Sequence, residues 1–404
     1  MLALATMVIL TLVVTSFSLR LDSHIKSESS RIDRRKTELA IQAGLSRAMA
    51  SLVDANINVT TTNDEWFNLG ETGSIAFTVA DSSVRIQIID TTRFVNLNTA
   101  TEEQLEQLNF TENQVAAILD WREDQLQPRQ LGAKDEYYNT LTTPYNVKLR
   151  RFDSVSELLL VREFTPADVL FPPQNNGGNA LLSGNIEDQP APIDILTIES
   201  RSPNRREDGS ERVNLNIAQN PQLVQAGISN QAAQAIIQRR NTQGQFTSLN
   251  QVFAVNGLNL QDAEVILNVA TISAENFLNG KINVNTAPEA VLRTIPEITD
   301  DQVQGILTRQ GSFEQLGDIT EVPGISTNTL QQLADFLTIG SQTFLIRLEG
   351  RRGPARSYAE AIVNIVDGQP RLLQLNRPIE RDPLTRWGWE IDPLSDQSLL
   401  EEPN

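Results

Sequence analysis

The sequence of 404 residues contains no cysteine and only one histidine, His24. The absence of cysteine excludes disulfides, thiolate metal sites and thiol nucleophiles. A single histidine excludes most histidine-based catalysis and zinc sites. The chain also has no phosphate-binding loop of the GxxxxGKS or GxxxxGKT kind and no recognisable set of nucleophile, base and orienting residue. We therefore expect a protein that is not an enzyme.

Basic residues are also scarce, since 33 lysines and arginines stand against 51 aspartates and glutamates. The formal net charge of -18 opposes nucleic-acid binding, which needs a concentrated positive field. Aromatic residues make up only 5% of the chain, but the hydrophobic share of 40% suits a folded, helix-rich protein and not a disordered one. The length predicts roughly two to four domains.

One uncharged apolar stretch is present, at residues 1–19. As an α-helix it would be about 28 Å long, close to the roughly 30 Å of a bilayer core. Beyond Arg20 the helical pattern continues without proline to Leu52 and becomes amphipathic. Two interpretations are open here, a pilin-like spine or an ordinary single-span anchor with a juxtamembrane helix. The residues that we assign to membrane insertion and assembly are Met1, Leu4, Ala5, Val8, Leu12 and Phe17.

A stretch with the pattern apolar-Asn-apolar-Asn occurs three times, at residues 95–100, 213–218 and 282–287, and indicates a repeated unit. After each copy we predict a helix, at residues 112–122, 230–240 and 300–309. An element opened by phenylalanine follows, at residues 152–161, 246–255 and 313–322. We expect capping boxes in the first and third units, Thr99 with Glu102 and Thr286 with Glu289. Each unit is thus predicted to be a cluster of short helices.

Strand patterns lie on both sides of these repeats. Residues 74–79 and 84–90 alternate apolar and polar side chains around a turn, and residues 343–349, 358–366 and 371–376 form a second group. The turn between the last two carries Asp367 and Gly368, a pair that suits a tight hairpin. Because an isolated hairpin is marginal in water, we expect both groups in one sheet, with the repeats inserted into it.

The first repeat is longer than the others, with 57 residues from its first asparagine to its phenylalanine against 33 and 31. The extra segment is acidic and contains Tyr137, Tyr138 and Tyr145. Carboxylates and loop carbonyls suit Ca²⁺, a hard cation that takes oxygen ligands, although the spacing is not that of an EF-hand. The alternative is an exposed acidic loop whose tyrosines pack on the repeat. The candidate metal ligands are Asp120, Glu123, Asp124, Asp135 and Glu136.

Three glycine-containing turns resemble the hairpins of helix-hairpin-helix modules, which bind DNA phosphates through backbone amides. They read Gly-Ile-Ser at 227–229, Gly-Leu-Asn at 257–259 and Gly-Ile-Ser at 324–326. Each lacks the second glycine that the close approach of a phosphate requires. Together with the acidic charge, this favours a role in protein contacts. A membrane-anchored DNA-binding or DNA-uptake protein is the alternative.

Five short motifs follow one another in the first repeat: residues 95–100, Asp120 with Trp121, Gly132 with Ala133, Tyr137 with Tyr138, and residues 156–161. Behind an apolar-led helix and between two strand groups, their order resembles general secretion pathway protein K. Members of this family are the large minor pseudopilins of type II secretion systems. The resemblance implies a subunit at the tip of the pseudopilus that initiates its assembly and supports the export of folded proteins across the outer membrane.

The resemblance also implies a location and partners. A protein K subunit crosses the bacterial inner membrane once and has its bulk in the periplasm. Its expected partners are the minor pseudopilins I and J and the inner-membrane assembly platform, with no nucleic acid. Calcium would be the only cofactor, but the family's acidic motif has acids where this chain has Gln125 and Lys134. Like other protein K members, the chain lacks the fifth-position glutamate of pilins and has Ala5 there, if Met1 is counted as position one.

The expected fold is α+β: a long N-terminal pilin-like helix packed on a small antiparallel sheet, with a large inserted helical-repeat region. The helix covers residues 1–54, and the sheet covers residues 55–92 and 341–377. Between the two parts of the sheet lie helical repeat 1 with the acidic insertion (93–172), a linker (173–211), repeat 2 (212–280) and repeat 3 (281–340). Residues 378–404 form an acidic tail, and its tryptophans, Trp387 and Trp389, predict that part of it docks.

Overall fold

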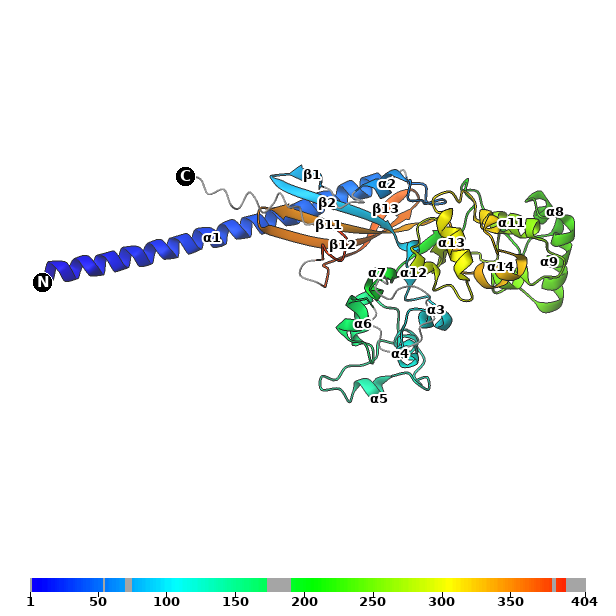
Figure 1. The fold of residues 1–404 in the computed structure, drawn as a ribbon, viewed down its shortest axis with the longest axis horizontal. Coiled ribbons are helices and arrows are strands. Elements are labelled where there is room, and N and C mark those ends of the chain that lie inside the picture. The colour runs from blue at the N-terminus through cyan, green and yellow to red at the C-terminus, as the bar shows by residue number, and fades with distance from the viewer. Residues whose placement is uncertain (1, 54, 70–74, 173–189, 380–382, 390–404) are drawn as a thin grey trace.

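The computed structural model describes residues 2–53, 55–69, 75–172, 190–379 and 383–389. The molecule is elongated (Figure 1). Helix α1 (Leu2–Ser51) projects from one end, a sheet lies along its second half, and the helical repeats lie beyond the sheet at the other end. This arrangement confirms the predicted α+β fold with an inserted helical region.

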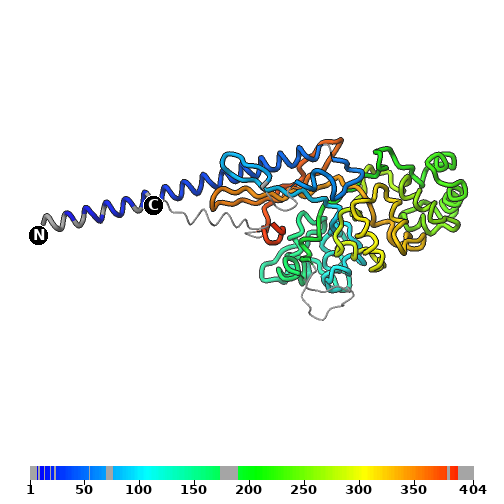
Figure 2. Tube along the Cα trace, turned by 45° about the horizontal axis from the view of Figure 1, so that its top comes forward, coloured from blue at the N-terminus to red at the C-terminus, as the bar shows by residue number. Residues whose placement is uncertain are grey.

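Helix α1 runs unbroken for 50 residues because it contains no proline and a single glycine, Gly44. That glycine allows a close approach to the sheet, since a Cβ atom there would lie 2.8 Å from the side chain of Val84 and 2.9 Å from that of Leu348. Ile41 and Leu52 are buried in the same core. Close packing therefore holds the second half of α1 on the sheet, while its first half projects (Figure 2).

The sheet has five antiparallel strands in the order β1-β2-β11-β12-β13. The register places Ile88 opposite Ile346 and Ile86 opposite Leu348, so alternate apolar side chains of both strands line the face under α1. The pairing of β2 with β11 joins the two predicted strand groups in one sheet. The strands are β1 (Ile75–Val79), β2 (Ser82–Asp90), β11 (Thr343–Arg352), β12 (Ala355–Val366) and β13 (Gln369–Asn376), and a short helix, α2 (Glu65–Asn68), adds Trp66 to this core.

Part of the C-terminal segment packs on the sheet as well. Leu384, Trp387 and Trp389 are buried together, and Tyr358 of β12 packs against them. The guanidinium of Arg347 in β11 lies 5.6 Å from the centre of the Trp387 ring, a cation–π contact. The docking predicted from the two tryptophans is thus observed. Residues 380–382 and 390–404 of the predicted tail lie outside the described residues.

Each repeat is a cluster of short helices closed by a pair of two-residue parallel strands. Repeat 1 comprises β3 (Val95–Asn96), α3 (Glu102–Glu106), α4 (Glu112–Arg122), α5 (Asp135–Tyr138), η2 (Val155–Leu160), α6 (Pro166–Leu170), α7 (Pro192–Ile195) and β4 (Leu196–Thr197). Repeat 2 comprises β6 (Val213–Asn214), α8 (Asn220–Gln225), α9 (Asn230–Gln243), α10 (Leu249–Phe253), α11 (Leu260–Val269) and β7 (Ala270–Thr271). Repeat 3 comprises β9 (Ile282–Asn283), α12 (Glu289–Leu292), α13 (Asp300–Thr308), η4 (Leu316–Glu321), α14 (Thr327–Leu333) and β10 (Leu337–Thr338).

The linker predicted at residues 173–211 contains helices and strands. Repeat 1 was predicted to end at residue 172, but it extends to β4 at residue 197. Val95 of β3 pairs with Leu196 of β4, so α7 and β4 complete repeat 1. Strand β5 (Arg201–Pro203) then pairs with β8 (Phe277–Asn279), which lies between repeats 2 and 3. Residues 173–189 of the predicted linker lie outside the described residues. The strand pairing is a contact between distant residues, which composition does not reveal.

The repeated asparagines have the same structural role in each unit. The first asparagine side chain accepts a hydrogen bond from the backbone N–H of the second at 2.9 Å in all three copies. The second asparagine then bonds both the N–H and the carbonyl oxygen of the phenylalanine that opens the third element. The pairs are Asn98 with Phe152, Asn216 with Phe246, and Asn285 with Phe313. The motif therefore joins the turn at the start of each unit to the phenylalanine that follows the unit's first helices.

The predicted capping boxes are wrong in position. In repeat 1 the backbone N–H groups of Thr99 and Ala100 both bond the carbonyl oxygen of Asn96, so the turn continues and α3 begins after Thr101. Thr101 forms the capping box there, with Gln104. In repeat 3 helix α12 follows Pro288 without a side-chain cap. Because of the asparagine turn, helices α3 and α12 each begin two residues later than the sequence pattern predicted.

A buried carboxylate fastens repeat 3 to the sheet. Asp90 ends β2, where the 3₁₀ helix η1 (Thr91–Arg93) begins, and is 1% exposed. Its carboxylate accepts hydrogen bonds from Asn283 Nδ2 at 2.9 Å and Thr286 Oγ1 at 2.7 Å. It also accepts from the backbone N–H of Thr92 at 2.7 Å. The first asparagine and the threonine of the third motif therefore hold the repeats in a fixed place relative to the sheet.

Candidate functional site

One side of helix α1 carries exposed apolar side chains at intervals of seven residues. Ile25, Ile32 and Leu39 are 59%, 51% and 55% exposed. Because seven residues make nearly two helical turns, the three side chains form one line, which we call the α1 stripe. This is the spacing by which helices pack side by side in coiled coils. Ile41 and Leu52, which share the predicted amphipathic segment, pack instead in the protein's own core.

The predicted membrane residues lie in the projecting half of α1. Met1 lies outside the described residues, as do the side chains of Leu4, Ala5 and Val8. Leu12 and Phe17 are 65% and 67% exposed. Among the residues that were described, no helix meets the length and apolarity that a membrane crossing requires. The transmembrane assignment of residues 1–19 is therefore not supported by the structure and stays a prediction.

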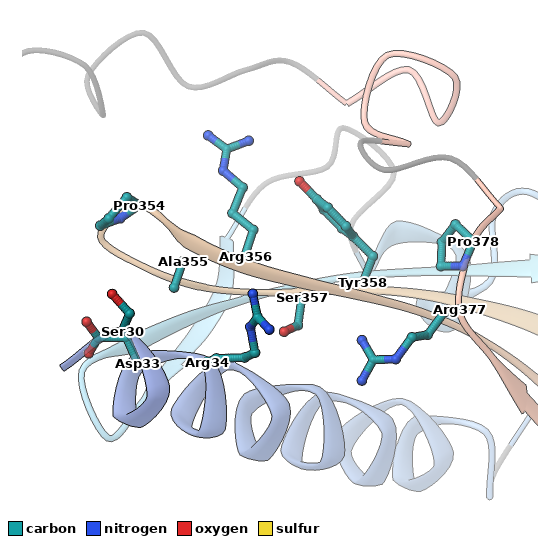
Figure 3. A pocket seen from close by; sticks show the side chains of 10 residues that line it. All are labelled: Ser30, Asp33, Arg34, Pro354, Ala355, Arg356, Ser357, Tyr358, Arg377 and Pro378. Carbon is teal, nitrogen blue, oxygen red and sulfur yellow. The ribbon is translucent and has the colours of Figure 1, made fainter. Parts of the chain in front are cut away.

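A cavity of about 710 Å³ lies between α1 and β12 (Figure 3). Asp33 and Arg34 of α1 line one side of it, and Ser357 and Tyr358 of β12 line another. Thr37 of α1 and Ser357 share a 2.7 Å hydrogen bond at the buried contact beside it. Charged and polar residues line the cavity together with Pro354, Ala355 and Pro378, whereas the α1 stripe is wholly apolar. Such a cavity suits polar side chains of a partner that lies along α1.

The five predicted metal ligands do not gather into one site. Asp120, at the end of α4, is 1% exposed, whereas Asp124 and Glu136 are exposed. Asp135 accepts a hydrogen bond from the backbone N–H of Val147 at 2.7 Å. Glu123 forms an ion pair with Arg129. Within the described ranges, no group of three or more such side chains could hold a metal ion. The predicted calcium ligand set is therefore not assembled.

Two basic side chains, those of Arg129 and Lys134, lie beside the carboxylates that were predicted to bind a metal. Arg129 contacts the Asp120 carboxylate through its backbone N–H at 3.1 Å and its Nη1 at 3.2 Å. Lys134 is 4% exposed, and its ammonium donates to the carbonyl oxygens of Asp120 and Glu123 at 2.5 and 3.2 Å. Burial lowers the pKa of Lys134, and the carboxylates of Asp120 and Glu123 oppose that shift. Gly132 is required here, since a Cβ atom would lie 1.8 Å from Asp120 Oδ2.

The tyrosines of the acidic segment pack on the repeat, as the alternative interpretation expected. Tyr138 is fully buried, and its ring centre lies 5.4 Å from that of Trp121 in an edge-to-face contact. Tyr145 lies 5.3 Å from Tyr138, and Tyr137 lies 5.2 Å from it. Burial raises the pKa of Tyr138 well above its ordinary value.

In their described residues the repeats contain six helical hairpins, three of which were predicted from the sequence. Each opens with a residue of positive φ: Asn109, Glu163, Gly227, Gly257, Glu297 and Gly324. In five of them the third residue is a cap whose side chain accepts the N–H three residues later: Thr111, Ser229, Asn259, Thr299 and Ser326. At these hairpins, one backbone N–H group at the start of the second helix thus already donates to a side chain of the protein and not to a phosphate. The missed hairpins have Asn or Glu at the position where glycine is the usual signal.

Comparison with protein families identifies the first repeat. Residues 91–170 match the family model described as type II secretion system protein K. The match to protein K lies within repeat 1. It agrees with the resemblance to protein K that was inferred from the order of motifs in this repeat. Residues 208–269 and 279–338, which are repeats 2 and 3, match the model of the helix-hairpin-helix motif.

Comparison with individual proteins adds less. No curated protein of similar sequence was found. Among solved structures, the chain is similar to one in the GspK-GspI-GspJ complex of the type 2 secretion system of enterotoxigenic Escherichia coli. The two chains are 12% identical, the match covers 89% of this chain and 100% of the other, and the TM-score is 0.43.

Proposed function

We propose that the protein is the tip subunit of a periplasmic pseudopilus, where it initiates assembly and supports the export of folded proteins across the outer membrane. The position of the repeats relative to α1 carries this proposal. Residues 91–342 are inserted between β2 and β11, and they project beyond the sheet at the end opposite the start of α1 (Figures 1 and 2).

A filament grows by repeating one contact between the lower face of a subunit and the upper face of the next. The upper end of this subunit is occupied by three helical repeats that share one continuous apolar core. The bonds of Asn283 and Thr286 to Asp90 keep repeat 3 against the sheet. A body held in that way would block the addition of a subunit above it. The terminal position has no such neighbour, and it is therefore the position that the shape suits.

The expected partners are the minor pseudopilins I and J. The α1 stripe, formed by Ile25, Ile32 and Leu39, supplies apolar area at coiled-coil spacing for their equivalent helices. The polar cavity between α1 and β12 lies near the same level of the helix and would receive charged side chains of one partner. Residues 1–19 would hold the subunit in the inner membrane before assembly, beside the assembly platform.

The proposal is tested by co-purification and by secretion. The full-length protein, extracted in detergent, should co-purify with I- and J-type pseudopilins of the same secretion system. A strain that lacks the gene should lose export of folded proteins and should regain it when the gene is returned. If the protein co-purified with neither partner, and if export in the deletion strain were unchanged, the tip assignment would be contradicted.

A DNA-binding role is the second candidate, because repeats 2 and 3 match the helix-hairpin-helix motif. Three observations weigh against it: the net charge of -18, the caps that occupy hairpin amides, and the absence of a second glycine in each hairpin. We expect no retardation of duplex DNA in a gel-shift titration at moderate salt. Saturable binding in the micromolar range that weakens steeply as salt rises would favour the DNA-binding candidate instead.

A further inference from the structure

The acidic segment after α4 is organised around an ammonium group that the chain itself supplies. Lys134 Nζ lies between the carbonyl oxygens of Asp120 and Glu123, at 2.5 and 3.2 Å, and 4.0 Å from Asp120 Oδ1. A positive charge is thus held by two backbone carbonyls and a carboxylate. These are the oxygen ligands that a calcium ion takes in loops.

A second cation completes the arrangement. The Arg129 guanidinium bridges the two carboxylates nearest to Lys134, with Nη1 3.2 Å from Asp120 Oδ1 and Nη2 2.8 Å from Glu123 Oε2. Two negative charges are therefore met by two positive charges. Gly132 brings the loop against the Asp120 carboxylate, and its carbonyl oxygen accepts a hydrogen bond from Arg162 Nη1 at 3.1 Å. Little room is left beside Asp120 for a further ligand.

We propose that Lys134 and Arg129 take the place of a calcium ion in this segment, so that it folds without a metal. A divalent cation bound by the same carbonyls would have to expel the Lys134 ammonium, because two like charges at that separation repel strongly in a buried site. Of the three acids that remain, Asp124 and Glu136 are exposed, and Asp135 accepts a hydrogen bond from the backbone N–H of Val147. Among the described residues they do not converge with the others on a metal site. This inference concerns only the first repeat and does not depend on the position of the protein in a pseudopilus.

The first test compares the full-length protein in EDTA and in millimolar calcium. We expect the same melting temperature in both, and the same rate of amide hydrogen exchange in peptides that cover residues 120–138. A ligand that binds the folded segment would raise the melting temperature and would slow this exchange. Either change in the wild-type protein, at calcium concentrations that leave peptides of repeats 2 and 3 unaffected, would overturn the proposal.

The second test converts the lysine into an acid. In Lys134→Glu the segment should exchange rapidly in EDTA and should regain protection with calcium, about tenfold when calcium is present at about ten times its Kd. Lys134→Met is the matched control, since it removes the charge without adding an oxygen ligand. Its segment should exchange rapidly in both conditions. If calcium protects neither variant, or both equally, Lys134 does not stand in a cation site. If Lys134→Glu fails to fold, the wild-type comparison decides alone.

Discussion

At the scale of single residues, the asparagine pairs explain why the repeated motif has its form. Only a side chain with both a donor and an acceptor can bond the N–H and the carbonyl oxygen of one distant residue. Asn285 does so at Phe313, and it also accepts from the backbone N–H of Gly311 at 3.1 Å. Asn285 and Phe313 are almost completely buried, at 0% and 1% exposure. Shortening the Asn285 side chain therefore removes hydrogen-bond partners from backbone groups that bulk water does not reach.

The first prediction follows from this burial. Asn285→Ala should lower the free energy of unfolding by about 2–4 kcal/mol, because it leaves buried backbone groups without partners. Asn220→Ala is the control, since Asn220 makes one side-chain bond to Asn230 near the surface and should cost less than about 0.5 kcal/mol. Urea denaturation of both variants measures the difference. Equal losses would mean that the asparagine bonds do not stabilise the repeat.

The second prediction concerns Lys281, at the start of repeat 3, whose ammonium donates to the carbonyl oxygen of Asp335 after α14. Burial lowers its pKa to about 8, and Asp335 opposes that shift. Between pH of about 8 and 10.5 the unfolded chain keeps a proton that the folded chain has released, so stability should rise with pH across this window. Lys281→Met should lack this rise. Melting curves from neutral to alkaline pH measure it, and profiles of the same shape for both proteins would contradict the shifted pKa.

At the scale of elements, the helices and strands with a clear period could be predicted. Helix α4 begins and ends where the pattern placed it, and the β2–β11 pairing unites the two strand groups. The predicted start of α3 was wrong by two residues, because those residues belong to the asparagine turn and not to the helix. Three hairpins escaped notice because Asn109, Glu163 and Glu297 adopt positive φ without being glycine. A search for glycine in the sequence therefore passes over these three positions.

The third prediction tests the α1 stripe. Ile32→Glu should abolish co-purification with the I- and J-type pseudopilins, because it places a charge in an apolar helix contact. Its effect on the melting temperature should be small, since Ile32 is exposed in the isolated subunit. Leu373→Glu is the matched control: Leu373 is 47% exposed on the edge strand β13 and is not part of the α1 stripe. A complex lost with both variants, or with neither, would show that the stripe is not the contact.

At the scale of the whole molecule, the sequence could place the repeats inside the sheet but could not say where they would project. That position depends on buried contacts between distant residues, such as Asp90 with Asn283 and Thr286. The same holds for the acidic segment. Its composition suggested a metal site, whereas the fold brings Arg129 and Lys134 to the carboxylates. The sequence shows Lys134 as a departure from the family's acidic motif, but only the fold shows that its ammonium is buried against the carbonyl oxygens of Asp120 and Glu123.

The position of the subunit in a filament is the central claim, and it can be measured directly. Isolated pseudopili can be labelled with gold-conjugated antibodies against repeat 2, which lies farthest from the start of α1 (Figure 1), and viewed by electron microscopy. We predict label at one end of each filament and none along its length. Label at regular intervals along the filament would contradict the tip assignment, because subunits would then stack above the repeats.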